Sequence, residues 1–222
     1  MAYAGGKGRT YPRLLNLMPP HTTYVETHLG GGAVMRNKRP AARQVGIEID
    51  PTVFRRWAEA PNQPCELVCC DAVGWLEQAS LEQSALIYAD PPYVRATRRR
   101  ERVYRHDYTD ADHIRLLECL KREKCMVMVS GYNNPLYAEV LHSWRRVSFA
   151  AMTHTGMREE CVWLNFEPSQ QLHDAWHLGD GYRQREIIRR RTTRLQRRVS
   201  ELSLPEQFGL LEWLRAKLGG SE

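Results

Sequence analysis

Short apolar runs that alternate with segments of helical spacing constrain the fold of this 222-residue chain most strongly. Residues 85–89, Ala-Leu-Ile-Tyr-Ala, are typical, because so short and continuous an apolar run is expected for a buried strand. Alternating strands and helices predict an α/β fold, with a mostly parallel seven-stranded sheet and helices on both faces. The predicted strands lie near residues 24–27, 44–49, 66–70, 86–89, 125–130, 146–150 and 160–166. The predicted helices lie near residues 9–18, 33–38, 51–59, 73–80, 110–123 and 134–142.

The alternation stops after Phe166, where Pro168 and polar residues indicate a linker. An arginine-rich helix near residues 185–202 and a short amphipathic helix near residues 206–218 are predicted beyond it. We therefore expect a domain over residues 1–166 and a basic helical extension over residues 167–222. The apolar side chains of the last helix are expected to pack on the rest of the chain rather than on a partner. They are Leu204, Phe208, Leu211, Trp213 and Leu214.

Composition predicts a globular, cytoplasmic protein. Hydrophobic residues make up 42% of the chain and charged residues 26%, which are ordinary values. No apolar run reaches the roughly 20 residues that cross a bilayer, and the first residues lack the apolar core of a signal peptide, so no membrane partner is expected. The six cysteines form no CxxC pair. Reduced thiols are therefore expected, with neither disulfides nor a metal site.

The motif at residues 90–93, Asp-Pro-Pro-Tyr, follows a predicted strand directly. It is expected at the carboxyl end of that strand, where open α/β sheets bind ligands. Asp90 can accept a hydrogen bond from an exocyclic amine. Pro91 and Pro92 donate no N–H, so their carbonyl groups can act as further acceptors, and Tyr93 offers a flat face to a base. The motif therefore points to an aminopurine substrate.

Positive charge is concentrated in two segments, one of which borders this motif. The formal net charge is +6 and the pI is about 9.1. Clustered arginines favour contacts to phosphate and guanine, so a nucleic acid partner is expected. The candidate contacts are Arg95, Arg98, Arg99, Arg100, Arg102 and Arg105 in residues 94–108, with Arg189 and Arg190 in the arginine-rich helix.

Three other strand ends carry groups suited to an adenosine-bearing cofactor. Glycines at residues 30–32 follow the first strand, and glycine lets a backbone approach a ligand closely. The second strand ends at Glu48, where an acid can bind ribose hydroxyls, and the third ends at Asp71, which can accept from an adenine amine. Neither GxGxxG nor GxxxxGK[ST] is present, which disfavours dinucleotides and triphosphates. These features favour S-adenosylmethionine (SAM) and transfer of its methyl group.

Seven motifs occur in an order that matches one family. In chain order they are Ala4-Gly5-Gly6-Lys7, residues 26–32, residues 48–50, Asp71, residues 90–93, Ser130-Gly131-Tyr132 and residues 158–165. Over about residues 1–166 the chain resembles the Dam-like DNA adenine N6-methyltransferases. The resemblance implies a Rossmann-like SAM-dependent methyltransferase fold and a target base that is flipped out of the duplex.

The resemblance also implies roles for individual residues. Asp90 would hold the target amine, the Pro91 carbonyl would help to orient it, and Tyr93 would stack on the base. Tyr3 and Lys7 would serve the cofactor and target region, and His28 would belong to the cofactor turn. The whole implied cofactor set is Tyr3, Lys7, Glu26, His28, Gly30, Gly32, Glu48, Asp71 and Asp90.

The chain departs from the family pattern in two places. Thr27 and His28 stand where the family usually has Pro and Phe, so His28 is either a cofactor contact or a polar residue satisfied within the protein. Only 18 residues separate Asp71 from Asp90, where the family often inserts a large target-recognition region. Recognition of the DNA sequence is therefore expected from residues 94–108 and from the arginine-rich helix, or it is relaxed.

The leading hypothesis is methyl transfer from SAM to the N6 amine of adenine in double-stranded DNA, by a monomer or homodimer of bacterial or phage origin. Its biological role stays open between restriction-modification, anti-restriction and regulation. Two alternatives stay open: an RNA or protein-glutamine N-methyltransferase, and a non-catalytic DNA-binding protein on the same scaffold. Cytosine ring methylation is disfavoured, because it needs a cysteine near the target and Cys65 begins a different predicted strand.

Overall fold

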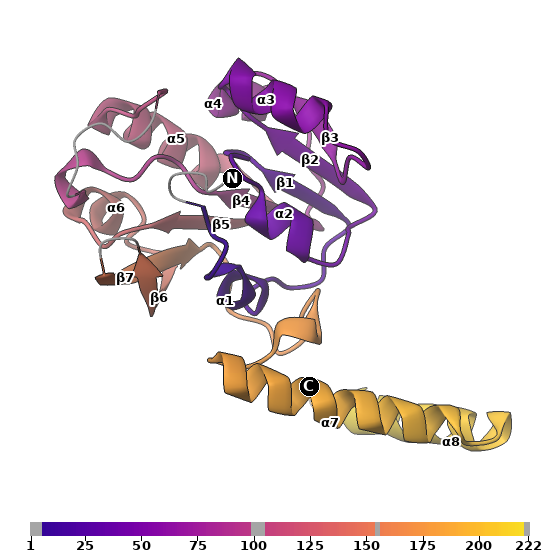
Figure 1. Ribbon diagram of the computed structural model, residues 1–222. Coiled ribbons are helices and arrows are strands. Elements are labelled where there is room, and N and C mark those ends of the chain that lie inside the picture. Colours follow the sequence, from indigo (N-terminus) through magenta and orange to yellow (C-terminus); the bar gives the residue numbers. More distant parts are fainter. Residues whose placement is uncertain (1–5, 99–104, 154–155, 220–222) are drawn as a thin grey trace. The chain divides into compact units, whose positions relative to one another are not determined.

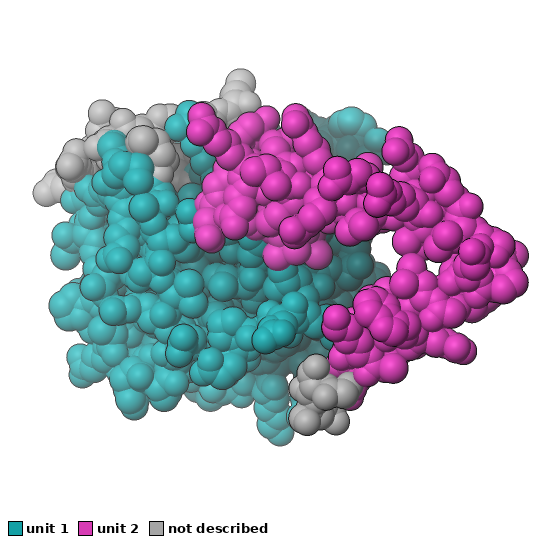
Figure 2. Space-filling view, turned by 90° about the horizontal axis from the view of Figure 1, so that it is seen from below, with its two compact units in different colours: residues 1–174 teal, residues 175–222 magenta. Residues whose placement is uncertain are grey.

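The computed structural model describes residues 6–98, 105–153 and 156–219. Contacts divide the chain into two compact units, residues 1–174 and residues 175–222 (Figure 2). The predicted boundary lay after residue 166. Residues up to 174 belong with the first unit because the backbone N–H of His173 donates to Met18 (2.9 Å) and Asp174 accepts from the N–H of Arg39 (2.9 Å).

The first unit is built on a seven-stranded sheet with the order β3-β2-β1-β4-β5-β7-β6 (Figure 1). The first five strands pair in parallel, and β7 is antiparallel to both β5 and β6. The strands are β1 (Thr23–Glu26), β2 (Arg43–Ile47), β3 (Glu66–Val68), β4 (Ala85–Ala89), β5 (Met126–Gly131), β6 (Arg145–Thr153) and β7 (Gly156–Leu164). The predicted Rossmann-like α/β fold is confirmed.

Helices cover both faces of this sheet because successive strand residues point to opposite sides. Val25 packs into a core with residues of α4, α5 and α6, whereas its neighbour Tyr24 packs into a second core with residues of α1, α2 and α3. The helices are α1 (Tyr11–Leu15), α2 (Ala33–Asn37), α3 (Pro51–Ala58), α4 (Ala72–Leu76), α5 (Asp110–Arg122) and α6 (Pro135–Val140). Thr109 caps the start of α5 and forms a capping box with Asp112.

The second unit consists of a short 3-10 helix, Ala175–His177, followed by α7 (Tyr182–Ser200) and α8 (Leu204–Gly219). The predicted packing of the apolar side chains of α8 on the rest of the chain stays a prediction, and within its own unit α7 leaves several of them largely uncovered. Phe208 is 63% exposed and Trp213 is 55% exposed. None of the helices that the structure describes combines the length and apolar character needed to cross a bilayer.

Candidate active site

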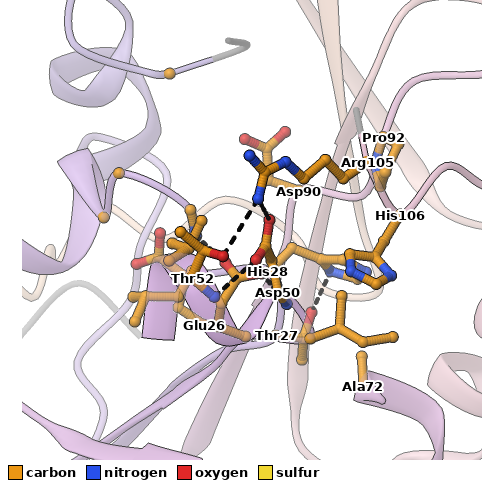
Figure 3. Close-up of a pocket in the computed structure, with 18 of the residues that line it drawn as sticks. Glu26, Thr27, His28, Asp50, Thr52, Ala72, Asp90, Pro92, Arg105 and His106 are labelled. Carbon is orange, nitrogen blue, oxygen red and sulfur yellow. Dashed lines mark hydrogen bonds and ion pairs between the residues drawn. The ribbon is translucent and has the colours of Figure 1, made fainter. Parts of the chain in front are cut away.

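A pocket of about 250 Å³ lies where the carboxyl ends of β1, β2 and β4 meet the loop that follows β3 (Figure 3). The strand order reverses at β1, since β2 lies on one side of it and β4 on the other. A crevice forms at such a switch point because consecutive connections leave the sheet in opposite directions. The fold therefore brings together residues that lie far apart in the sequence, from Gly6 and Lys7 to Arg105 and Tyr108.

The glycine turn after β1 forms one wall of the pocket. Gly30 and Gly32 have positive φ values of 47° and 58°, which favour glycine. A Cβ at Gly32 would lie 2.2 Å from the ring of Trp57, so this position has no room for a side chain. Trp57 also donates from its indole Nε1 to the carbonyl of Gly30 (2.8 Å). Trp57 of α3 thus holds the glycine turn in place, both by packing against Gly32 and by its hydrogen bond to Gly30.

Glu48 ties the glycine turn to the end of β2. Its two carboxylate oxygens accept from the backbone N–H of Gly30 (2.8 Å) and from that of Asp50 (2.9 Å). Burial raises the pKa of Glu48, and these two N–H donors oppose the rise. Glu48 lies on the pocket wall, as the prediction of a ribose contact requires, but it also holds the turn in shape.

Asp50 and Asp71 each cap a helix at the pocket. Asp50 accepts from the N–H of Thr52 (2.8 Å) at the start of α3, and Asp71 accepts from the N–H of Gly74 (3.0 Å) in the first turn of α4. Both carboxylates therefore have fixed positions before any ligand binds. Arg115 lies 3.3 Å from Asp71.

Arg105 lies at the side of the pocket formed by the end of β2 and the start of α3. Its guanidinium donates to the Thr52 hydroxyl (3.2 Å) and lies 3.8 Å from the carboxylate of Asp50 (Figure 3). The side chain is 72% exposed. Arg105 was predicted to contact DNA from its place in an arginine cluster. The structure places it over the acids at the end of β2, which the sequence pattern does not reveal.

The carboxylate of Asp90 pairs with Lys7. The Lys7 Nζ lies 2.6 Å from Oδ1 and 2.7 Å from Oδ2 of Asp90, and it also donates to the Tyr93 hydroxyl (2.7 Å). The side chains of Lys7 and Asp90 are 5% and 17% exposed. Burial alone would lower the pKa of Lys7, but the charge of Asp90 raises it overall. Burial raises the pKa of Asp90 and Lys7 opposes that rise, so each charge keeps the other ionised.

The ring of Tyr93 packs edge-on against Tyr132, with centroids 4.5 Å apart. Tyr132 directly follows β5 and belongs to the sixth of the seven motifs, Ser130-Gly131-Tyr132. The two rings and the Lys7 ammonium therefore form one group beside the pocket.

Glu26 is 3% exposed, and its Oε2 accepts from the Tyr24 hydroxyl (3.1 Å) and from the N–H of Met35 (3.0 Å). Burial raises the pKa of Glu26 to about 8, so the carboxyl group is mostly protonated at neutral pH. It lines the pocket as predicted, but as a neutral group that also anchors the start of α2.

His28 is both a pocket residue and a satisfied polar residue. Its Nδ1 lies 2.9 Å from the Thr27 hydroxyl, and its Nε2 lies 3.0 Å from the hydroxyl of Tyr108. Burial lowers the pKa of His28 to about 3, so the ring is neutral. Sequence reasoning missed Tyr108. Its only signal in the sequence was an aromatic residue at the end of residues 94–108, shortly before the predicted helix at residues 110–123.

Arg98, one of the predicted DNA contacts, is buried and paired within the protein. Its guanidinium forms two hydrogen bonds to the Asp107 carboxylate (2.9 and 2.6 Å) and also donates to the carbonyl of Tyr93. The side chain is 6% exposed, because it is enclosed in its own loop. Burial opposes the effect, but Arg98 lowers the pKa of Asp107 overall. Arg98 therefore holds the loop together rather than presenting charge to a phosphate.

The other predicted contacts differ in exposure. Arg95 is 59% exposed and lies 3.3 Å from Asp107, and Arg189 and Arg190 on α7 are 44% and 82% exposed. Four predicted site residues lie outside the described residues: Tyr3, Arg99, Arg100 and Arg102. Within the described parts of the chain, no group of three or more His, Cys, Asp or Glu side chains could hold a metal ion.

No family model and no curated protein sequence matches the chain. Among solved structures, it is similar to a Legionella pneumophila protein, with 13% identity, a TM-score of 0.49, and coverage of 84% of this chain and 90% of that one. It is similar to magnesium protoporphyrin IX methyltransferase from Synechocystis with bound SAM, at 10% identity, TM-score 0.47, and 71% and 78% coverage. It is also similar to an rRNA methylase from Streptococcus thermophilus, with 10% identity, a TM-score of 0.46, and coverage of 72% of this chain and 95% of that one. These similarities concern the fold and not the cofactor or the substrate of this chain.

Proposed function

We propose that the protein is a DNA adenine methyltransferase that transfers a methyl group from SAM to the N6 amine of adenine. One observation carries the proposal: the Asp90 carboxylate and the Tyr93 ring lie beside a pocket whose other walls are the glycine turn and the acids that follow β2 and β3. A cofactor site and an amine acceptor are thus adjacent, as direct transfer between two bound molecules requires.

The residues around the pocket fit SAM in the chemistry of their donors and acceptors. Glu48 and Asp50 are acceptors for ribose hydroxyls, and Asp71 is an acceptor for the adenine amine of the cofactor. Glycines at positions 30 and 32 let the backbone come close to a ligand. When bound, SAM supplies a methyl group activated by its positively charged sulfur.

Asp90 would accept a hydrogen bond from the target amine and turn the nitrogen lone pair toward the pocket. In the structure its carboxylate holds the Lys7 ammonium, so the site already accommodates a nitrogen donor bonded to both oxygens and to the Tyr93 hydroxyl. The open pocket beside Asp90 leaves space for a second molecule. Tyr93 would stack on the extruded base and offset part of the few kcal/mol that flipping costs. Alignment and electrostatics then supply the acceleration, and no covalent enzyme intermediate is required.

Two features favour double-stranded DNA as the partner. Position 90 carries Asp rather than the Asn of related motifs that act on amides. The helix α7 carries Arg190 at 82% exposure among many other arginines, which suits a phosphate backbone. Recognition of the DNA sequence is expected from residues 94–108 and from α7. Sequencing of the modified positions measures how strict that recognition is.

The test is incubation of the purified protein with SAM carrying an isotopically labelled methyl group and with duplex DNA from a methylation-free host. We expect label in N6-methyladenine after digestion to nucleosides and mass spectrometry, and sequencing of the modified positions gives the recognition site. Equal amounts of RNA and of unrelated protein are the matched substrates. Label only in RNA or in glutamine would replace the proposal with one of the alternatives, and no label in any substrate would contradict it.

A further inference from the structure

Glu160 on β7 is a buried acid for which the reaction above has no use. Its side chain is 8% exposed, and Oε2 has no hydrogen-bond partner among the described residues. A buried carboxylate oxygen without a partner is costly, and native structures that retain one usually have a reason for it. Glu160 is therefore a candidate for a group that receives a partner in another state of the protein.

Sheet register places Glu160 beside the Lys7 group. The antiparallel ladder of β5 and β7 ends at the pair Gly131 and Cys161, and Tyr132 and Glu160 are the residues just beyond that pair. Burial and then the charge of Glu160 raise the pKa of Tyr132, so the two side chains lie near each other. The Tyr132 ring packs on Tyr93, and the Tyr93 hydroxyl accepts from Lys7. The charge of Glu160 also contributes to the raised pKa of Lys7, whereas burial raises the pKa of Glu160 itself.

The Lys7–Asp90 pair creates a difficulty for the proposed reaction. The ammonium bonds to both oxygens of Asp90, the oxygens that the target amine would use. At 5% exposure Lys7 has little access to water, and a buried cation that loses its counter-ion is strongly destabilising. A second acid within the site would remove this cost.

We infer that Glu160 is the alternative acceptor for the Lys7 ammonium, which bonds to Asp90 before the substrate enters and moves to Glu160 when the target amine takes its place. The exchange breaks the hydrogen bonds from Lys7 to Asp90 and forms new ones from Lys7 to Glu160, and it transfers no proton. The total charge of Lys7, Asp90 and Glu160 stays constant. Glu160 is thus a positioning residue that acts through Lys7, and the inference rests on the proposed function for the identity of the amine.

The first experiment measures methylation kinetics of the full chain. Glu160→Gln keeps the shape and removes the charge, and we expect kcat/KM for DNA to fall about tenfold while the Kd for SAM stays unchanged. The matched control is Glu159→Gln, which makes the same change at the exposed neighbouring residue and is expected to have no effect. In a Lys7→Met background the ammonium is absent, so Glu160→Gln should then have no further effect. An equal loss in both backgrounds would mean a merely structural role and overturn the inference.

The second experiment needs no substrate, so it separates this inference from the proposed function. In Asp90→Asn, Lys7 loses its counter-ion and should turn to Glu160. The double variant Asp90→Asn with Glu160→Gln should therefore melt roughly 5 °C below the value expected from the two single variants. Glu159→Gln in the same background should be additive. Additivity of Glu160→Gln would overturn the exchange even if the enzyme methylates DNA, whereas a clear coupling without methylation would support the exchange and reject the proposed substrate.

Discussion

The Lys7 Nζ lies 2.6 Å from Oδ1 of Asp90, so one ammonium covers the carboxylate at the end of β4. The two residues are 83 positions apart in the sequence. The contact gives Asp90 a fixed orientation and a charged partner. Any reaction that uses the Asp90 carboxylate therefore requires the Lys7 ammonium to move away first.

Lys7→Met tests the energetics of this pair. Removal of one partner of a buried ion pair leaves the other charge unpaired, so we expect a loss of about 3 kcal/mol in the free energy of unfolding at pH 8. The folded-state pKa of Asp90 would then lie further above its unfolded value of 3.8. An acid with a raised folded pKa favours folding at low pH, so the loss should shrink at pH 5. Urea denaturation at both pH values measures it. Lys124→Met, at an exposed position, is the control, and a loss independent of pH would contradict the assignment.

Asp90→Ala should lower the rate of methyl transfer, whereas Asp71→Ala should weaken the binding of SAM. Asp90→Ala is expected to lower the methylation rate by at least about 100-fold with little change in the Kd for SAM, because the carboxylate acts on the target amine. Asp71→Ala should instead weaken SAM binding, since Asp71 lies on the cofactor wall and caps α4. Isothermal titration and single-turnover rates separate the two. Retained turnover in Asp90→Ala would refute its role.

The hydrogen bond between His28 and Tyr108 should couple the glycine turn to the end of residues 94–108. His28→Phe or Tyr108→Phe each removes one partner of this partly buried hydrogen bond, at a cost of about 1–2 kcal/mol. The double variant should cost less than the sum, because both single changes break the same interaction. Thermal unfolding and SAM affinity of all four proteins form the cycle. Strict additivity would mean that the two side chains act separately.

Stability should decrease below pH 6.5 because of His21. Its ring stacks on His173 with centroids 3.7 Å apart, and burial lowers the pKa of His21 to about 3. Between pH 6.5 and 3 the unfolded chain binds a proton that the folded chain does not, so folding weakens as pH falls. His21→Phe should reduce that slope by up to about 1.4 kcal/mol per pH unit. Denaturation between pH 7.5 and 4.5 measures it, with His142→Phe as an exposed control. An unchanged slope in His21→Phe would contradict the prediction.

Arg98 and Arg190 should differ although both were predicted to contact DNA. Arg190→Gln removes a charge that is 82% exposed, so DNA binding should weaken and the slope of log K against log salt should fall by about 1. Arg98→Gln removes the partner of Asp107 inside its loop and should lower the melting temperature without changing that slope. A salt-dependent loss in Arg98→Gln would restore it to the DNA-binding set.

Much of the site could be predicted because the groups follow strand ends directly. Glu48, Asp71 and Asp90 each come just after an apolar run, and parallel strands bring their carboxyl ends to one edge of the sheet. The contacts of Arg105 could not be predicted, for a related reason. Its sequence neighbours are arginines, but its contacts, Asp50 and Thr52, lie on a distant element. Tyr108 was missed because its partner His28 is 80 positions away.

The sequence alone determined the alternation of strands and helices, the glycine turn and the motif at the end of β4, because these depend on local periodicity and on the backbone properties of glycine and proline. Only the tertiary structure decided which charges meet. It paired Lys7 with Asp90 and buried Glu160 near the Lys7 ammonium. Such pairings depend on which strands become neighbours in the sheet, and that order is fixed by packing of the whole domain rather than by any segment of the chain.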